Sequence, residues 1–192
     1  PEKIKGVSFY NNLNKILKTN KVKYFQLRLK KISTVEMLKI SKKVKKITNK
    51  NNVKFLVNDK PFVAKMVEAD GCHLGQKDMK FLEAKKIIKN KIIGITCHNS
   101  KVLIKQTVKL NPSYIAIGAF FKSETKIVKY RTDINLLKYA KSITKIPIVT
   151  IGGINNKNYK KLLLNNANFL AISGYIWNNK KLKPIEAIEE LK

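Results

Sequence analysis

The chain has 192 residues, a length that suits a single domain with a substantial hydrophobic core. Hydrophobic residues make up 44% and charged residues 28%, and no apolar run approaches the roughly 20 residues of a transmembrane helix. The two cysteines, Cys72 and Cys97, make no disulfide framework. We therefore expect one domain over residues 1–192, working in a reducing cytoplasm without a membrane partner.

The net charge of +29 comes from 41 basic residues, of which only Arg28 and Arg131 are arginines. A basic face is typical of nucleic-acid binding. The lysines are dispersed, however, and few aromatic residues stand among them for base stacking. This pattern favours lysine spread over solvated helix faces, whose field would still attract a small anionic substrate. We expect no specific nucleic-acid partner.

Short apolar runs rich in β-branched residues recur along the chain, each followed by a polar turn and a helical pattern. Such continuous runs are typical of parallel strands covered on both faces. The expected strands are Tyr24–Leu27, Lys54–Val57, Gly71–Leu74, Ile92–Thr96, Tyr114–Gly118, Pro147–Ile151 and Phe169–Ser173.

Helical patterns alternate with these strands, beginning with Phe9–Thr19. Ser33-Thr34-Val35-Glu36 is a capping box that predicts a helix with an apolar face of Leu38, Ile40, Val44 and Ile47. The remaining helices are expected near Pro61–Val67, Phe81–Ile88, Lys101–Leu110, Asp133–Ile143, Asn158–Leu164 and Pro184–Leu191.

Strict alternation of strands and helices predicts a parallel sheet with right-handed crossovers. Seven expected strands fit a compact (β/α)8 TIM barrel if the first strand lies just upstream of Pro1, which is not a methionine. They also fit an open, doubly wound sheet, and periodicity alone does not separate the two architectures.

Polar residues cluster where each expected strand ends, and in a parallel barrel these ends converge on the rim where such enzymes do their chemistry. Arg28, Lys30 and Lys126 are cations suited to phosphate, and Arg28 adds a fork geometry that lysine cannot imitate. Asp59 and Asp78 are hard oxygen ligands suited to Mg²⁺.

Glycine pairs at two strand ends suggest a second anion site. Gly152-Gly153, followed by Asn155 at an expected helix start, is typical of a backbone-amide phosphate cradle. Together with Ser173-Gly174 it matches the loops that often bind phosphate in barrels.

The histidines and cysteines allow other sites. His73, at an apolar strand end, suits a packed histidine as well as it suits a ligand. The adjacent pairs Cys72-His73 and Cys97-His98 lack the usual zinc-ligand spacing, and Cys97-His98 has no third partner for nucleophilic catalysis.

Several of these motifs, taken together, resemble those of thiamine phosphate synthases, in order and spacing, from about Lys23 to Trp177. The motifs are Gln26-Leu27-Arg28-Leu29-Lys30, Val57-Asn58-Asp59, Asp70-Gly71-Cys72-His73-Leu74-Gly75-Gln76-Lys77-Asp78, Ile93-Gly94-Ile95-Thr96, Ser123-Glu124-Thr125-Lys126 and Ile151-Gly152-Gly153-Ile154-Asn155. The resemblance implies the TIM barrel, with a first strand upstream of Pro1.

The resemblance also implies a reaction and a set of site residues. A pyrimidine diphosphate would lose diphosphate with the help of Mg²⁺, and the thiazole nitrogen of a thiazole phosphate would capture the resulting cation. Asp59 and Asp78 match the Mg²⁺ ligands of the family. The residues that match its contacts to the pyrimidine and diphosphate are Gln26, Arg28, Lys30, Asn58, Thr96 and Lys126. Those that match its contacts to the thiazole phosphate are Ser123, Thr125, Gly152, Gly153, Ser173 and Gly174.

The chain departs from the family pattern at Leu29, Ser123 and Gly174, where glutamate, threonine and serine are usual. Strand alternation predicts that Leu29 points away from the ligand. The related thiazole tautomerase is an alternative, although it carries a histidine where Ala119 stands here. A non-catalytic anion or nucleic-acid binding module is a further alternative, favoured only by the charge.

Overall fold

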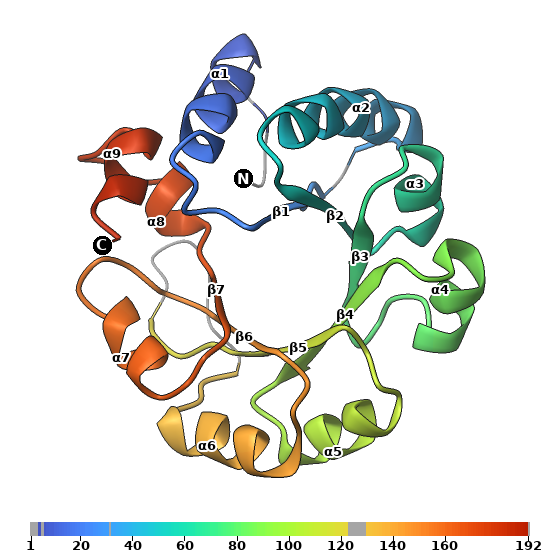
Figure 1. Ribbon diagram of the computed structural model, residues 1–192, viewed down its shortest axis with the longest axis vertical. Helices are drawn as coiled ribbons and strands as arrows, with labels where there is room; N and C mark the ends of the chain where they lie inside the picture. The colour runs from blue at the N-terminus through green and yellow to red at the C-terminus, as the bar shows by residue number, and fades with distance from the viewer. Residues whose placement is uncertain (1–3, 5, 31, 123–129, 192) are drawn as a thin grey trace.

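The computed structural model describes residues 4, 6–30, 32–122 and 130–191. Seven parallel strands are hydrogen-bonded to one another in chain order and curl into a ring around a central axis (Figure 1). The strands are β1 Tyr24–Leu27, β2 Lys54–Asn58, β3 Gly71–Leu74, β4 Ile92–His98, β5 Tyr114–Gly118, β6 Ile148–Ile151 and β7 Phe169–Ala171. All seven expected strands are confirmed, three with the same bounds and four with one end shifted by one or two residues.

Helices follow the strands and lie outside the ring (Figure 1). They are α1 Gly6–Leu17, α2 Thr34–Lys50, α3 Pro61–Met66, α4 Phe81–Ile88, α5 Lys101–Lys109, α6 Ile134–Ile143, α7 Tyr159–Leu164, α8 Gly174–Trp177 and α9 Pro184–Glu189. Of these, only α8 was not expected, because its four residues show no helical period.

The strand order β1 to β7, with helices on the outer side only, is that of a curled partial barrel. An open doubly wound sheet would carry helices on both faces, so that alternative is wrong. Among the described residues no strand pairs with both β1 and β7, and the complete eight-stranded barrel stays a prediction. The two edge strands nevertheless approach each other, since the rings of Tyr24 and Phe169 make an edge-to-face contact with centroids 5.1 Å apart.

The central strands β3 and β5 are buried on both faces, which explains their continuous apolar runs. Two large clusters fill the space between the strands and the helices; Leu27 and Val57 belong to one, Ile115 and Ile117 to the other. A smaller cluster of Leu56, Tyr114 and Ala116 fills the interior of the ring, with Ile92 and Val149 packed against it.

Helix α2 begins as predicted, because the Ser33 hydroxyl accepts a hydrogen bond from the Glu36 N–H at 3.1 Å. Its predicted apolar face was partly wrong. The fully buried residues are Met37, Ser41, Val44 and Thr48, while Leu38, Ile40 and Ile47 are half-buried beside them. The true face contains two polar residues, which a search for apolar periodicity passes over.

Asp70, directly before β3, connects α2 to the N-terminal end of β2. Its carboxylate accepts hydrogen bonds from Lys45 Nζ at 2.7 Å, the Phe55 N–H at 2.9 Å and Lys54 Nζ at 3.1 Å. Burial alone would raise the pKa of Asp70, but the hydrogen bonds from Lys45, Phe55 and Lys54 lower it to about 2. The carboxylate therefore stabilises the fold in its ionised form.

We expect Asp70→Asn to reduce the free energy of unfolding by about 2 kcal/mol at pH 7, because charge-assisted hydrogen bonds to a partly buried group are lost. A lowered carboxyl pKa stabilises the fold fully above the unfolded value near 3.8, and that contribution disappears as the pH falls towards 2. Urea unfolding of both proteins between pH 7 and pH 2 should show the gap closing below about pH 4. Glu68→Gln, at an exposed carboxylate, is the matched control; an equal loss in both variants would contradict the role of Asp70.

Candidate active site

The carboxyl ends of the strands bring most of the predicted site residues to one rim. Gln26 lies on β1, with Arg28 and Lys30 in the segment that follows it; Asn58 ends β2, Asp59 follows it, and Thr96 lies on β4. Asp78 lies after β3, Gly152 and Gly153 after β6, and Ser173 and Gly174 where α8 begins after β7. Ser123, Thr125 and Lys126 lie outside the described residues.

Asp59 and Asp78 form a pair of carboxyl groups joined by a side-chain hydrogen bond. Burial is the main cause that raises the pKa of Asp59 to about 6, and the hydrogen bond and charge of Asp78 raise it further. The charges of Arg28 and Lys30 oppose this rise, so both cations act on the same carboxyl group. The structure thus brings together two predicted metal ligands and two predicted phosphate cations.

The backbone fixes both carboxylates. Asp59 has a φ of 65° and its N–H donates to the His73 carbonyl at 2.8 Å, which turns the chain sharply at the end of β2. The Asp78 carboxylate accepts a hydrogen bond from the Gly75 N–H at 2.7 Å. Leu29, between the two cations, is 9% exposed and packs into the outer core, which confirms that it points away from the rim.

The pair suits Mg²⁺ by its chemistry. Mg²⁺ is usually held by one or two carboxylates and completes its octahedron with water and substrate phosphate oxygens. In the described part of the chain no group of three or more His, Cys, Asp or Glu residues converges, so a cage made only of protein ligands is not formed there. Two adjacent carboxylates beside cations suit a metal ion that is coordinated both by the protein and by an anionic substrate.

A chain of polar side chains crosses the interior of the ring beneath these carboxylates. Tyr114 Oη lies 2.8 Å from His73 Nδ1, and His73 Nε2 lies 2.7 Å from Thr96 Oγ1. Burial raises the pKa of Tyr114, and the side chain of Gln26 opposes this rise. Burial lowers the pKa of His73 to about 4, so its ring is neutral at pH 7. Of the two roles considered for His73, the structure shows the packed, hydrogen-bonded one.

Tyr114 belongs to this chain but was not identified from the sequence. An aromatic residue that begins a buried strand is typical of a hydrophobic core, and Tyr114 does pack in the interior cluster. A usable signal was Gly94 on the neighbouring strand. A Cβ at Gly94 would lie 1.9 Å from Cζ of Tyr114, so the phenol ring lies directly against the glycine.

The loop after β6 requires glycine at two positions, because of its backbone conformation and its close packing. Gly152 and Gly153 have φ values of 105° and 63°, and a Cβ at Gly153 would lie 2.4 Å from the Lys122 carbonyl oxygen. The expected helix start at Asn155 is wrong, because Asn155 forms a turn in which its side chain accepts from the Lys157 N–H at 2.9 Å. Helix α7 begins only at Tyr159.

The cysteines and His98 do not form a nucleophilic site. Burial raises the pKa of Cys72 to about 12 and also raises the pKa of Cys97, and both thiols are free. His98 packs on the ring of Tyr130, with centroids 4.5 Å apart.

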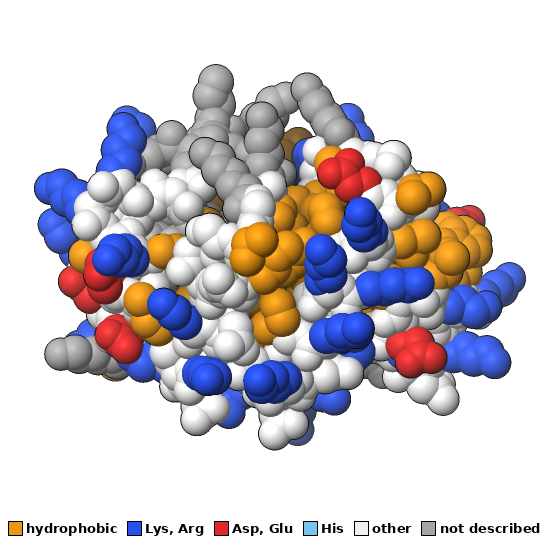
Figure 2. All heavy atoms as spheres, turned by 90° about the horizontal axis from the view of Figure 1, so that it is seen from above, with side chains coloured by type: hydrophobic (Ala, Val, Ile, Leu, Met, Phe, Trp, Pro, Cys, Tyr) orange, Lys and Arg blue, Asp and Glu red, His pale blue; other side chains and the backbone are white. Residues whose placement is uncertain are grey.

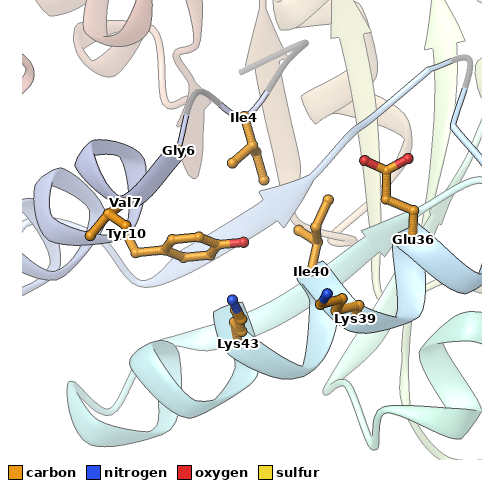
Figure 3. Close-up of a pocket in the computed structure, with 8 residues that line it drawn as sticks. All are labelled: Ile4, Gly6, Val7, Tyr10, Glu36, Lys39, Ile40 and Lys43. Carbon is orange, nitrogen blue, oxygen red and sulfur yellow. The ribbon is translucent and has the colours of Figure 1, made fainter.

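A separate pocket lies between α1 and α2 (Figure 3). Tyr10, Ile40 and Lys43 line it, and Lys43 Nζ lies 5.5 Å from the centroid of the Tyr10 ring. None of the predicted site residues lines this pocket, so it is distinct from the rim.

The basic residues are scattered. Figure 2 shows Lys and Arg side chains spread over the face seen from above, with apolar side chains between them. Among the described residues, no helix has the length and hydrophobicity needed to cross a membrane.

Comparison with known proteins identifies what this architecture resembles. The family model described as "Thiamine monophosphate synthase" matches residues 1–176. The chain is 59% identical over 192 residues to thiamine-phosphate synthase from Pelagibacter ubique, covering 100% of this chain and 93% of that protein. It is 36% identical over 169 residues to the enzyme from Erythrobacter litoralis, covering 86% and 79%. The solved thiamine phosphate pyrophosphorylase from Pyrococcus furiosus superposes with a TM-score of 0.84 at 28% identity, covering 95% of this chain and 86% of that one.

Proposed function

The chain belongs to the thiamine monophosphate synthase family, and we propose that its rim of strand ends holds a pyrimidine diphosphate, Mg²⁺ and a thiazole phosphate during the reaction. The enzyme is a transferase of thiamine biosynthesis with small-molecule substrates. The observation that carries the residue assignment is the Asp59–Asp78 pair beside the Arg28 and Lys30 charges.

We assign the first half of the reaction to these four residues together with Lys126, Asn58, Gln26 and Thr96. Asp59 and Asp78 would hold Mg²⁺, which supplies positive charge to the diphosphate oxygens as the carbon–oxygen bond breaks. Arg28, Lys30 and Lys126 would stabilise the same oxygens, whose negative charge grows as diphosphate leaves. Gln26, Asn58 and Thr96 would position the pyrimidine diphosphate.

The second half joins the two rings. The pyrimidine-methyl cation accepts the electron pair of the thiazole nitrogen, and a carbon–nitrogen bond forms without a general base or a nucleophilic side chain. We propose that Ser123, Thr125, Gly152, Gly153, Ser173 and Gly174 hold the thiazole phosphate. Half-buried Phe120 and Phe121, whose N–H groups donate to Ile151 and Gly152, would shield the cation from water.

Three further proposals concern the whole protein. The curled seven-stranded sheet supports a complete (β/α)8 barrel, with the remaining strand between β7 and β1. Its sequential strand order supports one barrel domain over residues 1–192. Two buried free thiols support a cytoplasmic location.

We expect the protein to form thiamine phosphate from both substrates and Mg²⁺, and not to interconvert thiazole phosphate tautomers. A tautomerase needs a base within hydrogen-bond reach of the thiazole. Here the position of its histidine is Ala119, whose Cβ packs against Gly152. Chromatography with each substrate omitted in turn measures synthase activity, and NMR of the thiazole carboxylate measures tautomerisation. Rapid tautomerisation without thiamine phosphate would reverse the assignment.

A further inference from the structure

A single carboxylate oxygen directly after α9 contacts two segments that follow neighbouring strands. Glu190 Oε2 accepts a hydrogen bond from the Tyr175 hydroxyl at 3.2 Å and another from the side-chain amide of Asn156. Asn156 lies in the segment that joins β6 to α7, and Tyr175 lies in α8, which follows β7. In Figure 1 the chain after α9 runs beside the segment that joins β6 to α7. Glu190 therefore connects the segments that follow β6 and β7.

Both of these segments carry residues assigned above to the thiazole phosphate. Gly153 lies three residues before Asn156, and Gly174 directly precedes Tyr175. The last paired residues of β6 and β7 come before both segments, so the sheet ladder does not extend to these glycines. A phosphate that is held from both segments needs a fixed distance between them. The hydrogen bonds of Glu190 to one residue in each segment supply that constraint.

Hydrogen bonds within the segment after β6 carry the constraint to Gly153. The Asn158 side-chain amide donates to the Gly153 carbonyl at 3.0 Å, and its oxygen accepts from the Asn155 N–H at 2.9 Å. The Asn155 side chain accepts from the Lys157 N–H at 2.9 Å. These bonds cross-link the segment on both sides of Asn156, so a contact that holds Asn156 also restricts Gly153.

Helix α9 provides an anchored backbone for Glu190. Ile188 on this helix is buried in the core. Lys21 Nζ donates to the backbone carbonyl of Glu189 at 3.0 Å and to those of Ile188 and Leu191 at 3.4 and 3.3 Å. Carbonyls at the C-terminal end of a helix have no partner within the helix, and a cation is favourable there. The exposed side chain of Glu190 thus extends from a turn that is held on the other side by Lys21.

We infer that Glu190 is a positioning residue, which sets the spacing between the two halves of the thiazole phosphate site through Asn156 and Tyr175. This inference rests on the proposed function, which assigns the residues of both segments to that phosphate. Burial raises the pKa of Tyr175, and the hydrogen bond and charge of Glu190 raise it further, to about 12. The phenol therefore keeps its proton and donates at neutral pH. The pyrimidine diphosphate is assigned to the ends of other strands, so Glu190 affects one substrate only.

Steady-state kinetics of Glu190→Ala test the inference. We expect KM for the thiazole phosphate to rise about fivefold, because two hydrogen bonds to a charged but exposed acceptor are lost. KM for the pyrimidine diphosphate should not change, and kcat should change less than twofold. Glu190→Gln keeps an acceptor oxygen and should restore KM to within about twofold of the wild type. Glu189→Ala is the matched control: it removes the adjacent exposed carboxylate, keeps the carbonyl that Lys21 binds, and should leave both KM values unchanged.

A double-mutant cycle shows whether the two contacts act through Glu190. Tyr175→Phe and Asn156→Ala each remove one donor and should each raise KM for the thiazole phosphate about twofold. Adding either change to Glu190→Ala should cause no further rise, because the acceptor is already absent. Rises that multiply in the double variants would show that each residue acts independently of Glu190, and would overturn the inference.

Gly153→Ala separates the positioning role of Glu190 from the phosphate assignment. A Cβ at Gly153 would lie 2.4 Å from the Lys122 carbonyl oxygen, so this variant displaces the segment after β6. It should raise KM for the thiazole phosphate if that segment holds the phosphate. If Gly153→Ala raises this KM and Glu190→Ala does not, the positioning role is wrong and the phosphate site stands. If neither variant changes it, both assignments are wrong.

Discussion

Asp59→Asn and Asp78→Asn are each expected to lower kcat by about 100-fold or more at saturating substrates, because each removes a carboxylate from the proposed Mg²⁺ site. Asparagine is the informative replacement at Asp59, since it tolerates the positive φ of 65° and keeps the turn. Part of the loss should be recovered at high Mg²⁺. Initial rates over a Mg²⁺ titration measure both effects.

Asp133→Asn is the matched control for the metal ligands. Asp133 caps α6 by accepting from the Asn135 N–H at 2.9 Å, and asparagine caps a helix equally well. This variant removes the same charge from a residue that is not among the proposed Mg²⁺ ligands and should keep wild-type kcat. Full activity of either Asp59→Asn or Asp78→Asn at low Mg²⁺ would show that the metal assignment is wrong.

Arg28→Ala is expected to lower kcat by about 100-fold with a smaller change in KM for the pyrimidine diphosphate. The guanidinium stabilises charge that grows as diphosphate leaves, so its contribution is larger in the transition state than in the bound substrate. Arg28→Lys should fall between the wild type and Arg28→Ala, because lysine keeps the charge and loses the fork. The same split between kcat and KM is predicted for Lys126→Ala, at a position outside the described residues.

Steady-state kinetics with the second substrate saturating separates the two constants for these variants. Arg131→Lys, at the exposed second arginine of the chain, is the control and should behave as the wild type. If Arg28→Ala raises KM and leaves kcat unchanged, the arginine docks the substrate without lowering the barrier.

The sequence was sufficient for the strands because most of them are covered on both faces and so form largely apolar runs, as in the fully buried Tyr114–Gly118. The same pattern predicted the rim, because polar residues directly after parallel strands all lie at the carboxyl-terminal edge of the sheet. The sequence did not predict the buried face of α2 correctly, because Ser41 and Thr48 lie on that face. It also did not predict the four-residue helix α8. Closure of the ring depends on pairing between distant strands, which local periodicity does not encode.

The candidate site likewise contains residues that the sequence predicted and residues that it did not. Asp59, Asp78, Arg28 and Lys30 were predicted from charge at strand ends, and the structure brings them together. Tyr114 was missed because the sequence pattern of a buried strand indicates that its ring packs in the core, but gives no sign of the hydrogen bond that its hydroxyl makes with His73. The sequence left two roles open for His73, a packed residue or a ligand, because it does not reveal that the two ring nitrogens have partners on different strands.

The contact between Tyr114 and Gly94 also constrains how this interior can change over evolutionary time. The two residues share one volume, so a side chain at position 94 requires a smaller residue at position 114. A lineage cannot cross between the two arrangements by a single tolerated substitution, since either order leaves a clash or a void. Relatives that keep glycine at the position of Gly94 should therefore keep an aromatic ring opposite it, and relatives that lose one should have lost both.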